Sequence, residues 1–230
     1  MGFFGNLAGN KALTAHGKGE HEKAMQLYEE AIAKGANNLR VLRGYSVLLI
    51  RMFQFDKALE ILKKMEKLPG LQAKDKSDIR VNYAIIVAKK GQLDHALEIL
   101  ESELRHYRNG TMYSVIGFLK IEKGNVEEAM AFNQEALEYD DKDPVFLDNM
   151  GQTYYRLLGD KESARPYFEK ALELKPNAID TNYFMALYDI EEGNLNQAKD
   201  RLETARKGFT SPLNYATPEM IQAKLAEICA

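Results

Sequence analysis

The sequence predicts an all-α fold in which pairs of helices follow one another along the chain. Three observations favour this class. A similar segment recurs six times within the 230 residues. The spacing of the copies suits two helices of about four turns joined by tight connections. Runs of β-branched residues, which strands favour, are scarce, and the spacing is too short for a strand–helix–strand unit.

The six copies align on one alanine each. The intervals between these alanines are 34, 38, 33, 35 and 34 residues. A period that stays this regular along nearly the whole chain indicates a repeat architecture. In order, the copies are GEHEKAMQLYEEAI (Ala24), FQFDKALEILKKM (Ala58), GQLDHALEILESE (Ala96), GNVEEAMAFNQEAL (Ala129), GDKESARPYFEKAL (Ala164) and GNLNQAKDRLETAR (Ala198).

A glycine lies five residues before the aligned alanine in five of the six copies. Glycine adopts the left-handed backbone without a steric penalty, so we expect a first helix to end there and a second helix to begin. The second copy has Phe53 at this position. After the glycine, Asn125, Asp160 and Asn194 are expected to cap the second helices of their copies.

The fifth copy shows how side-chain size is arranged within the segment. Ala164 is followed by Phe168 about one helical turn later, then by Ala171, and Pro176 closes the segment. Small residues let two helix backbones approach closely, and an aromatic ring on the same face fills the space beyond. Proline disfavours a helical residue before it, so we expect it to end the second helix.

These residues resemble the tetratricopeptide repeat. The fifth copy fits best, with Leu147, Met150, Gly151 and Tyr154 in its first half. The resemblance covers about residues 5–212 and implies a right-handed superhelical α-solenoid of helix-turn-helix repeats, with the first helices lining the concave side. The chain is therefore identified as a single domain, residues 1–230, of six repeats and a C-terminal capping helix. The predicted boundaries are 5–38, 39–72, 77–110, 110–143, 144–178 and 179–212, with the capping helix at 217–229.

Two segments depart from the regular pattern. The interval of 38 residues places four extra residues in the segment 66–78, where Pro69 and Gly70 predict a longer surface loop; a hinge or contact loop is the alternative. After the sixth copy, Thr217 can cap a helix that begins at Pro218. The apolar face of this helix is expected to cover the exposed end of the stack.

The composition is that of a soluble globular protein, with 45% hydrophobic residues, 28% charged residues and a net charge of −3. Apolar stretches fall far short of the roughly eighteen residues of a membrane span, and the N-terminus does not read as a signal peptide. Cys229 is the single cysteine. We therefore expect a cytoplasmic protein without membrane insertion, and the negative charge argues against nucleic acid as a partner.

The sequence lacks the residue spacings that are typical of metal sites and phosphate-binding loops. The four histidines lack the spacing of metal ligands, and the segment GNLAGNKAL departs from a phosphate-binding loop at Asn10 and Ala12. The repeats take up nearly all of the chain and leave no residues for a catalytic domain. The sequence therefore predicts no enzyme activity, no cofactor and no metal.

The first helices carry a second apolar stripe beside the one expected to pack on the partner helix. A helix that is apolar on two faces is either buried on both or presents one face for binding. Two interpretations stay open: core between repeats, or a groove for an apolar peptide or an amphipathic helix. The candidate groove residues are Arg43, Val47, Ile50, Arg51, Val81, Asn82, Ile85, Lys89, Phe118, Ile121, Asn149, Tyr155, Arg156, Tyr183, Leu187 and Ile190.

Charged residues near this stripe differ along the chain. They would orient a bound peptide, or they are solvated charges of the helix face. The basic residues of the earlier repeats are Arg40, Arg43, Arg51 and Lys89, and the acidic residues of the later repeats are Glu122, Asp148, Asp180 and Glu191, with Arg156 as the exception. The neighbours of Asn82 and Asn149 do not form the carboxylate clamp of co-chaperone repeats, so we expect no binding of chaperone tails.

The predicted function is a non-catalytic protein–protein interaction scaffold that binds a peptide or helix of a partner in the concave groove. The alternative is a self-associating structural module, a homodimer within a larger assembly. The related pentatricopeptide repeats read single-stranded RNA, but the net charge of −3 disfavours that function here.

Overall fold

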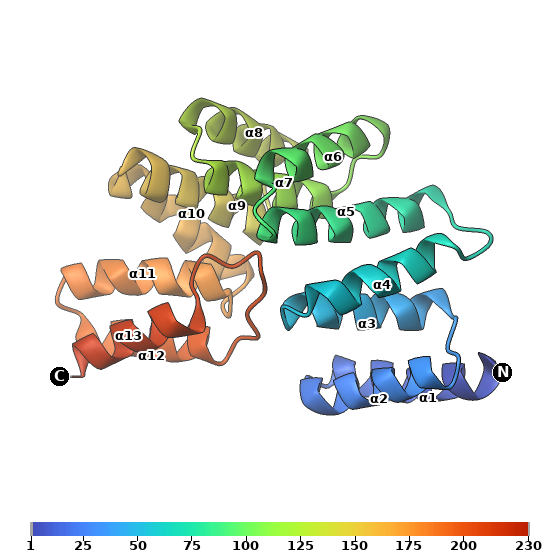
Figure 1. Ribbon diagram of the computed structural model, residues 1–230. Helices are drawn as coiled ribbons and strands as arrows, with labels where there is room; N and C mark the ends of the chain where they lie inside the picture. The colour runs from blue at the N-terminus through green and yellow to red at the C-terminus, as the bar shows by residue number, and fades with distance from the viewer. Residues whose placement is uncertain (1, 230) are drawn as a thin grey trace. The chain divides into compact units, whose positions relative to one another are not determined.

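The structure, a computed structural model, describes residues 2–229; Met1 and Ala230, the ends of the predicted domain, lie outside this range. The described residues are mainly helical and contain no strand, which confirms the all-α class (Figure 1). Along the chain the helices are α1 (Gly2–Gly17), α2 (His21–Ala33), α3 (Leu39–Arg51), α4 (Phe55–Glu66), α5 (Ala73–Lys89), α6 (Leu93–His106), α7 (Gly110–Lys123), α8 (Val126–Tyr139), α9 (Pro144–Gln152), the π-helix η1 (Thr153–Leu158), α10 (Lys161–Leu174), α11 (Ile179–Glu191), α12 (Leu195–Arg206) and α13 (Pro218–Ile228).

Internal contacts divide the chain into two compact units, Met1–Tyr107 with α1 to α6 and Arg108–Ala230 with α7 to α13. Within each unit every helix packs on the next one along the chain. First helices of successive pairs also touch, as α1 and α3 do in the N-terminal unit and α7 and α9 in the C-terminal unit. This is the packing of a helical solenoid. The single domain and the repeat boundaries remain predictions.

The predicted turn positions share one backbone conformation. The five turn glycines have φ between 67° and 87°, and these are Gly19, Gly91, Gly124, Gly159 and Gly193. Phe53, which replaces the glycine of the second copy, has φ 57° and is the one non-glycine residue with positive φ among the described residues. The turn geometry is therefore kept where the favoured residue is missing.

Two of the three expected helix caps form. The Asn125 side chain accepts a hydrogen bond from the Glu128 amide at 3.2 Å, and Asp160 accepts one from the Ser163 amide at 2.9 Å. The expectation for Asn194 is wrong: its amide nitrogen donates instead to Glu192 at 3.3 Å. Its ψ is 55°, against 108° at Asn125, so its side chain does not reach the α12 amides.

The size pattern of the fifth copy describes its packing. Ala164, Phe168 and Ala171 are all fully buried. A Cβ atom added to Gly151 on α9 would lie 2.6 Å from the Phe168 ring, so the two helices meet where one has no side chain. The sequence pattern predicts that Tyr83 packs with Ala84 and Val87 against the partner helix; this is wrong for Tyr83, whose side chain is 41% exposed.

The two irregular intervals have different structural causes. The expected long loop over 66–78 is confined to residues 67–72, because α5 already begins at Ala73. α5 has 17 residues where α3 has 13, so the four extra residues form one more helical turn. The 35-residue interval before Ala164 spans η1, and a π-helix accommodates one residue more than an α-helix over the same length.

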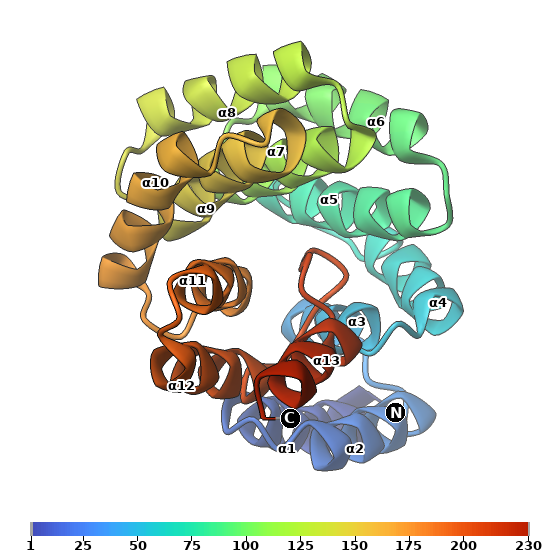
Figure 2. The same ribbon diagram turned by 90° about the vertical axis from the view of Figure 1, so that its left-hand side faces the viewer.

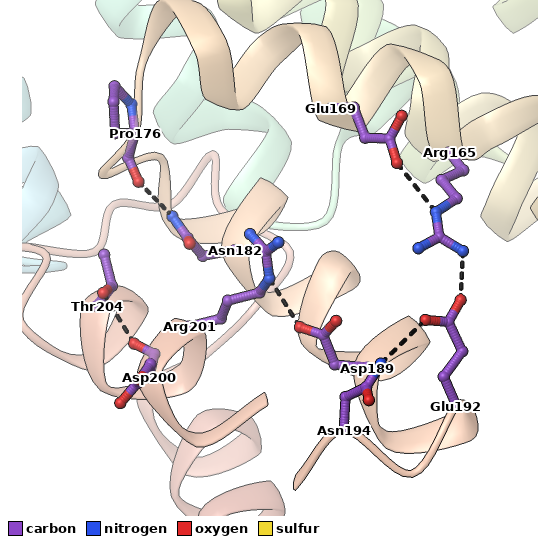
Figure 3. Close-up of polar contacts among 10 residues, drawn as sticks. All are labelled: Arg165, Glu169, Pro176, Asn182, Asp189, Glu192, Asn194, Asp200, Arg201 and Thr204. Carbon is purple, nitrogen blue, oxygen red and sulfur yellow. Dashed lines mark hydrogen bonds and ion pairs between the residues drawn. The ribbon is translucent and has the colours of Figure 1, made fainter. Parts of the chain in front are cut away.

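Polar contacts tie the last hairpins of the C-terminal unit together (Figure 3). Arg201 on α12 donates to Asp189 on α11 at 2.7 Å, and Asp189 is only 2% exposed. Arg165 on α10 forms ion pairs with Glu169 of its own helix and with Glu192, which follows α11 (Figure 3). These ion pairs and hydrogen bonds link α10, α11 and α12 to one another.

Helix α13 covers the end of the C-terminal unit. Thr217 caps it by accepting a hydrogen bond from the Met220 amide at 3.2 Å. Ile221 and Leu225 are buried with residues of α11 and α12 in one apolar cluster. The outward side of α13 is polar, so the apolar end of α12 is not left in water.

Candidate functional site

The predicted groove residues fall into both units, eight in each. Those that are buried contribute to packing and offer no surface to a ligand. Asn149 illustrates this: its side-chain amide donates to the Ser114 carbonyl at 3.0 Å and joins α9 to α7. The buried members are Ile50, Val81, Ile85, Phe118, Ile121, Asn149 and Tyr183.

The remaining groove residues keep some accessible surface. Lys89 is exposed, and the others are half-buried. In the N-terminal unit these are Arg43, Val47, Arg51 and Asn82, and in the C-terminal unit Tyr155, Arg156, Leu187 and Ile190. Leu187 and Ile190 pack against the apolar cluster beneath α13. Peptide binding by these residues stays a prediction.

Several of the charged residues that define the predicted basic and acidic ends are paired or buried. Arg43 forms an ion pair with Asp75 at 2.5 Å. Glu122 pairs with Arg156 at 2.6 Å, and Glu191 pairs with Lys161. Asp148 (8% exposed) and Asp180 (6% exposed) are buried, so they do not contribute a solvated acidic face.

One cluster in the C-terminal unit combines buried charge, stacked aromatic rings and an irregular segment of chain. The segment is residues 208–217, which we call the strap. It connects α12 to α13, leaves the helical layer and runs beside α11, as both views of the ribbon show (Figures 1 and 2). Ser211 and Asn214 close a turn through a backbone hydrogen bond of 3.0 Å, with Pro212 at its second position.

Asp180, in the first turn of α11, holds the strap by three hydrogen bonds. Its Oδ2 accepts from the Asn214 side-chain amide and from the Tyr215 backbone amide, both at 3.1 Å. Its Oδ1 accepts from the Ala216 backbone amide at 3.0 Å. A carboxylate is a strong acceptor, and two of its three donors are main-chain groups that any peptide possesses.

The ring of Tyr215 completes a stack that begins in the core. Phe168 on α10 stacks on Phe184 of α11 with centroids 5.0 Å apart and planes 7° apart. Phe184 stacks on Tyr215 at 5.2 Å and 17°. The outer face of Tyr215 is covered by the Arg156 guanidinium, whose central carbon lies 4.0 Å from the ring centroid. Tyr215 therefore sits in a slot between an aromatic ring and a cation.

The π-helix supplies the outer wall of this slot. Arg156 lies within η1, and its guanidinium donates to Gln152 at 2.9 Å and to Glu122 at 2.6 Å. Tyr155, the preceding residue, contacts the Phe184 ring at 5.0 Å. The extra residue of η1 turns the following side chains relative to those of α9, and it thereby sets the direction of both groups.

A second buried carboxylate lies beside the first. Asp148 on α9 accepts hydrogen bonds from Gln152 at 2.7 Å and from Thr181 at 2.6 Å. Burial, and next the charge of Asp180, raise the pKa of Asp148 to about 7. Burial also raises the pKa of Asp180, although its bonds to the strap and the charge of Arg156 act in the opposite direction.

Tyr155 and Arg156 were among the predicted groove residues, whereas the strap and Phe184 were not. Two signals were present. The interval before Ala164 is 35 residues where 34 is usual, which indicates one extra residue in the repeat that carries Tyr155 and Arg156. The segment Ser-Pro-Leu-Asn at 211–214 has the composition of a β-turn, which a plain extended linker to the last helix does not need.

The residues described by the structure include no group of three or more potential metal ligands. Over the same range, every helix is too short or too polar to cross a membrane. The chemistry at the strap is that of recognition by stacking, hydrogen bonding and charge, which is how proteins bind extended chain segments.

Comparison with known proteins identifies the repeats. Tetratricopeptide repeat models match residues 15–68 and 146–178. Superkiller protein 3 of Saccharomyces cerevisiae is 28% identical over 131 residues, which cover 57% of this chain and 8% of that protein. Tetratricopeptide repeat protein 1 of Schizosaccharomyces pombe is 26% identical over 145 residues, covering 59% of this chain and 14% of that protein. The matched region is thus a small part of either relative.

Solved structures show the same fold. A tetratricopeptide repeat protein from Parabacteroides merdae superposes with a TM-score of 0.75 at 13% identity, over 98% of this chain and 84% of that one. A thermophilic repeat protein of Thermus thermophilus gives 0.63 at 17% identity, over 84% and 99%. The Cut9–Hcn1 hetero-tetramer of the APC/C gives 0.66 at 14% identity, over 97% and 42%.

The chain therefore carries tetratricopeptide repeats at residues 15–68 and 146–178, and it has the helical solenoid fold of solved tetratricopeptide repeat proteins. Arrays of this family act in general as protein-interaction scaffolds and are typically non-catalytic, and the fold supports that general role here.

Proposed function

We propose that this protein is a non-catalytic scaffold that binds short extended segments of partner proteins on the faces of its first helices. The strap is the observation that supports this proposal most directly. Residues of η1 and α11 already hold an irregular segment of the chain through a carboxylate, an aromatic ring and a guanidinium. The face of the first helices therefore has the chemistry that peptide recognition needs. A cytoplasmic location remains a prediction.

A displayed library of random peptides, selected on the full-length chain, tests this proposal. We expect enriched peptides whose binding is lost when an exposed first-helix side chain is made acidic. Tyr83→Asp on α5 is the test variant, because Tyr83 is 41% exposed. Leu195→Asp on the second helix α12 is the matched control, since Leu195 is 47% exposed. If no peptide is enriched, or both variants weaken binding equally, the first-helix faces are not the binding surface.

Self-association is the alternative function. Light scattering at micromolar concentration decides it, because a monomer has a mass of 26.1 kDa and a homodimer twice that. A mass at the monomer value over the whole concentration range excludes the homodimer. A stable dimer that binds none of the library peptides would instead favour the structural module.

A further inference from the structure

We propose that the strap occupies, as a built-in competitor, a peptide-binding site of the C-terminal unit, and that this site takes a partner segment with a carboxamide residue, an aromatic residue and a small residue in sequence. Residues 214–216 of the chain, Asn-Tyr-Ala, are the template for that ligand. The inference rests on the proposed function and names the partner chemistry and its regulation.

The three template residues each meet a distinct feature of the site. Asn214 and the backbone amides of Tyr215 and Ala216 donate to Asp180. The Tyr215 ring fills the slot between Phe184 and Arg156. The Ala216 side chain is fully buried, which leaves room for a small residue there and no larger one.

The walls of the site are held by residues outside the strap. Phe184 is stacked between the strap and Phe168, and the Tyr155 ring also packs on it at 5.0 Å. Arg156 is fixed by Gln152 and Glu122. A site whose groups are oriented before a ligand arrives loses less entropy on binding, so it keeps its shape for a peptide that replaces the strap.

The strap itself has the features of a segment that can leave. Its turn is internally bonded, since the Ser211 amide and hydroxyl both donate to the Asn214 side chain at 2.9 and 3.2 Å. Most of its residues are only half-buried. Helix α13 has anchors of its own in Ile221 and Leu225, which lie in the same apolar cluster as Ala216 of the strap. Irregular segments that keep solvent-exposed surface open more readily in native proteins than the packed helices they connect.

Asp180 explains why an arbitrary peptide would not displace the strap. With the strap in place the carboxylate is 6% exposed and accepts three hydrogen bonds from it, so a competitor without matching donors forgoes all three. A competitor must bring two successive backbone amides and a carboxamide to the same oxygens. Displacement is then an exchange of one set of hydrogen bonds for another, and the site selects for that set.

Because the strap is tethered, its effective concentration at the site is on the order of millimolar. A free peptide of the same sequence must therefore bind weakly to the intact chain and more tightly once the strap is disabled. The probe is the peptide fluorescein-SPLNYATP-amide, which carries the label on its N-terminus and has the sequence of residues 211–218. The matched control peptide has alanine in place of the tyrosine.

The host proteins are the intact full-length chain and the double variant Asn214→Ala with Tyr215→Ala, which empties the slot without changing its walls. We expect the double variant to bind the probe at least about tenfold more tightly than the intact chain, by fluorescence anisotropy. The control peptide should bind at least about tenfold more weakly than the probe. Adding Asp180→Asn to the double variant should abolish the gain.

Equal affinity of the two hosts, or equal affinity for the two peptides, overturns the inference. If the double variant does not fold, hydrogen exchange on the intact chain replaces it. Several millimolar probe should then speed exchange of the Tyr215 and Ala216 amides, and unchanged exchange means that the strap is a fixed brace. A concentration-dependent dimer that the probe dissociates would make a second copy the occupant and would refute a partner peptide.

This outcome is separate from that of the proposed function. Library peptides that bind in a Tyr83-dependent manner, while the double variant ignores the probe, would remove the inference and leave the scaffold proposal standing. If neither experiment detects a peptide, both proposals fall.

Discussion

At the scale of single residues, Phe53 is the clearest conflict between sequence and backbone. It ends its helix at φ 57°, a region that costs a residue with a Cβ about 1–2 kcal/mol. Its side chain is 57% exposed and its nearest ring neighbour is Phe55 at 5.8 Å, so packing compensates little of that cost. The turn survives because the helices on both sides are packed into the N-terminal unit.

Phe53→Gly is therefore expected to stabilise the N-terminal unit. The gain in free energy of unfolding should be about 0.5–1 kcal/mol, because relief of strain exceeds the added entropy of the unfolded chain. Gly91→Ala is the reverse control in the same unit: φ is 87° there and an added Cβ meets nothing within 4 Å. It should lose about 1 kcal/mol. Urea denaturation measures both, and a destabilised Phe53→Gly would contradict the argument.

At Gly151, glycine is required by the lack of space for a side chain and not by the backbone conformation. Gly151→Ala places a Cβ 2.6 Å from the Phe168 ring, which is fully buried and cannot move away. We expect a loss of about 1–3 kcal/mol. Gly110→Ala, whose Cβ would find its nearest atom at 3.8 Å, should be close to neutral. Adding Phe168→Leu should recover part of the loss in denaturation experiments.

At the scale of elements, the additional turn of α5 is held at its start by Asp75. This carboxylate accepts a hydrogen bond from the Gln72 amide at 3.0 Å and forms an ion pair with Arg43 of α3. The hydrogen bond from Gln72, and next that from Arg43, hold the pKa of Asp75 below its ordinary value. The same side chain thus begins one first helix and ties it to the preceding one.

Asp75→Ala should loosen this turn. Amides of residues 72–77 are expected to exchange faster in the variant, because the cap and the ion pair are both lost. Asp78→Ala is the control, since Asp78 contacts Arg43 at 3.4 Å but does not cap the helix. Since the Asp75 pKa is lowered by folding, protection should be full above about pH 4 and should be lost as the pH falls further. Equal exchange in both variants would contradict the capping role.

The π-helix is the other element whose form has a local consequence. A regular α-helix through residues 153–158 would turn Arg156 and Tyr155 away from their present directions. Their contacts with Tyr215 and Phe184 depend on that single extra residue. In this repeat an irregularity of helix geometry thus coincides with the site, whereas the longer α5 adds only a turn.

At the scale of the whole molecule, the stabilities of the two units are expected to change in opposite directions with pH. In the N-terminal unit, burial lowers the pKa of His16 and of His21, with the charge of Arg51 as a further cause in each. In the C-terminal unit, burial raises the pKa of Asp148 and Asp180. The histidines favour the folded state when neutral, and so do the two aspartic acids.

The sign follows from proton binding. As the pH falls through 6.5, the ordinary pKa of histidine, His16 and His21 bind more protons in the unfolded N-terminal unit than in the folded one. The stability of this unit should therefore fall as the pH drops. The folded C-terminal unit binds more protons at Asp148 than the unfolded one between its ordinary value of 3.8 and about 7, so its stability should rise as pH drops.

Native-state hydrogen exchange at about pH 7.5 and about pH 5.5, corrected for intrinsic rates, measures both units in one chain. Core amides at Leu100 and Leu202 report on them separately, since both residues are fully buried. Protection at Leu100 should decrease at the lower pH, and protection at Leu202 should increase. Asp148→Asn should remove the response at Leu202 alone. Changes of the same sign in both units would show that other groups dominate.

The sequence by itself determined the fold class and the turns. Helical periodicity, the regular alanine interval and the turn glycines are local signals, and each is decided by steric and hydrogen-bonding preferences within a few residues. The cap at Asn125 and the helix at Pro218 were predictable for the same reason. Tyr155 and Arg156 were placed in the candidate site because they lie on a recognisable face of a recognisable helix.

Only the tertiary structure decided which side of each first helix remains accessible and what lies on it. Val81, for which core and groove both stayed open, is buried, and Tyr83, which was predicted to pack, is exposed. A helix with apolar residues on two faces is oriented by its neighbours. The joining of the strap to Asp180 links residues more than thirty positions apart. Such contacts depend on packing between distant segments, and no local preference in the chain encodes them.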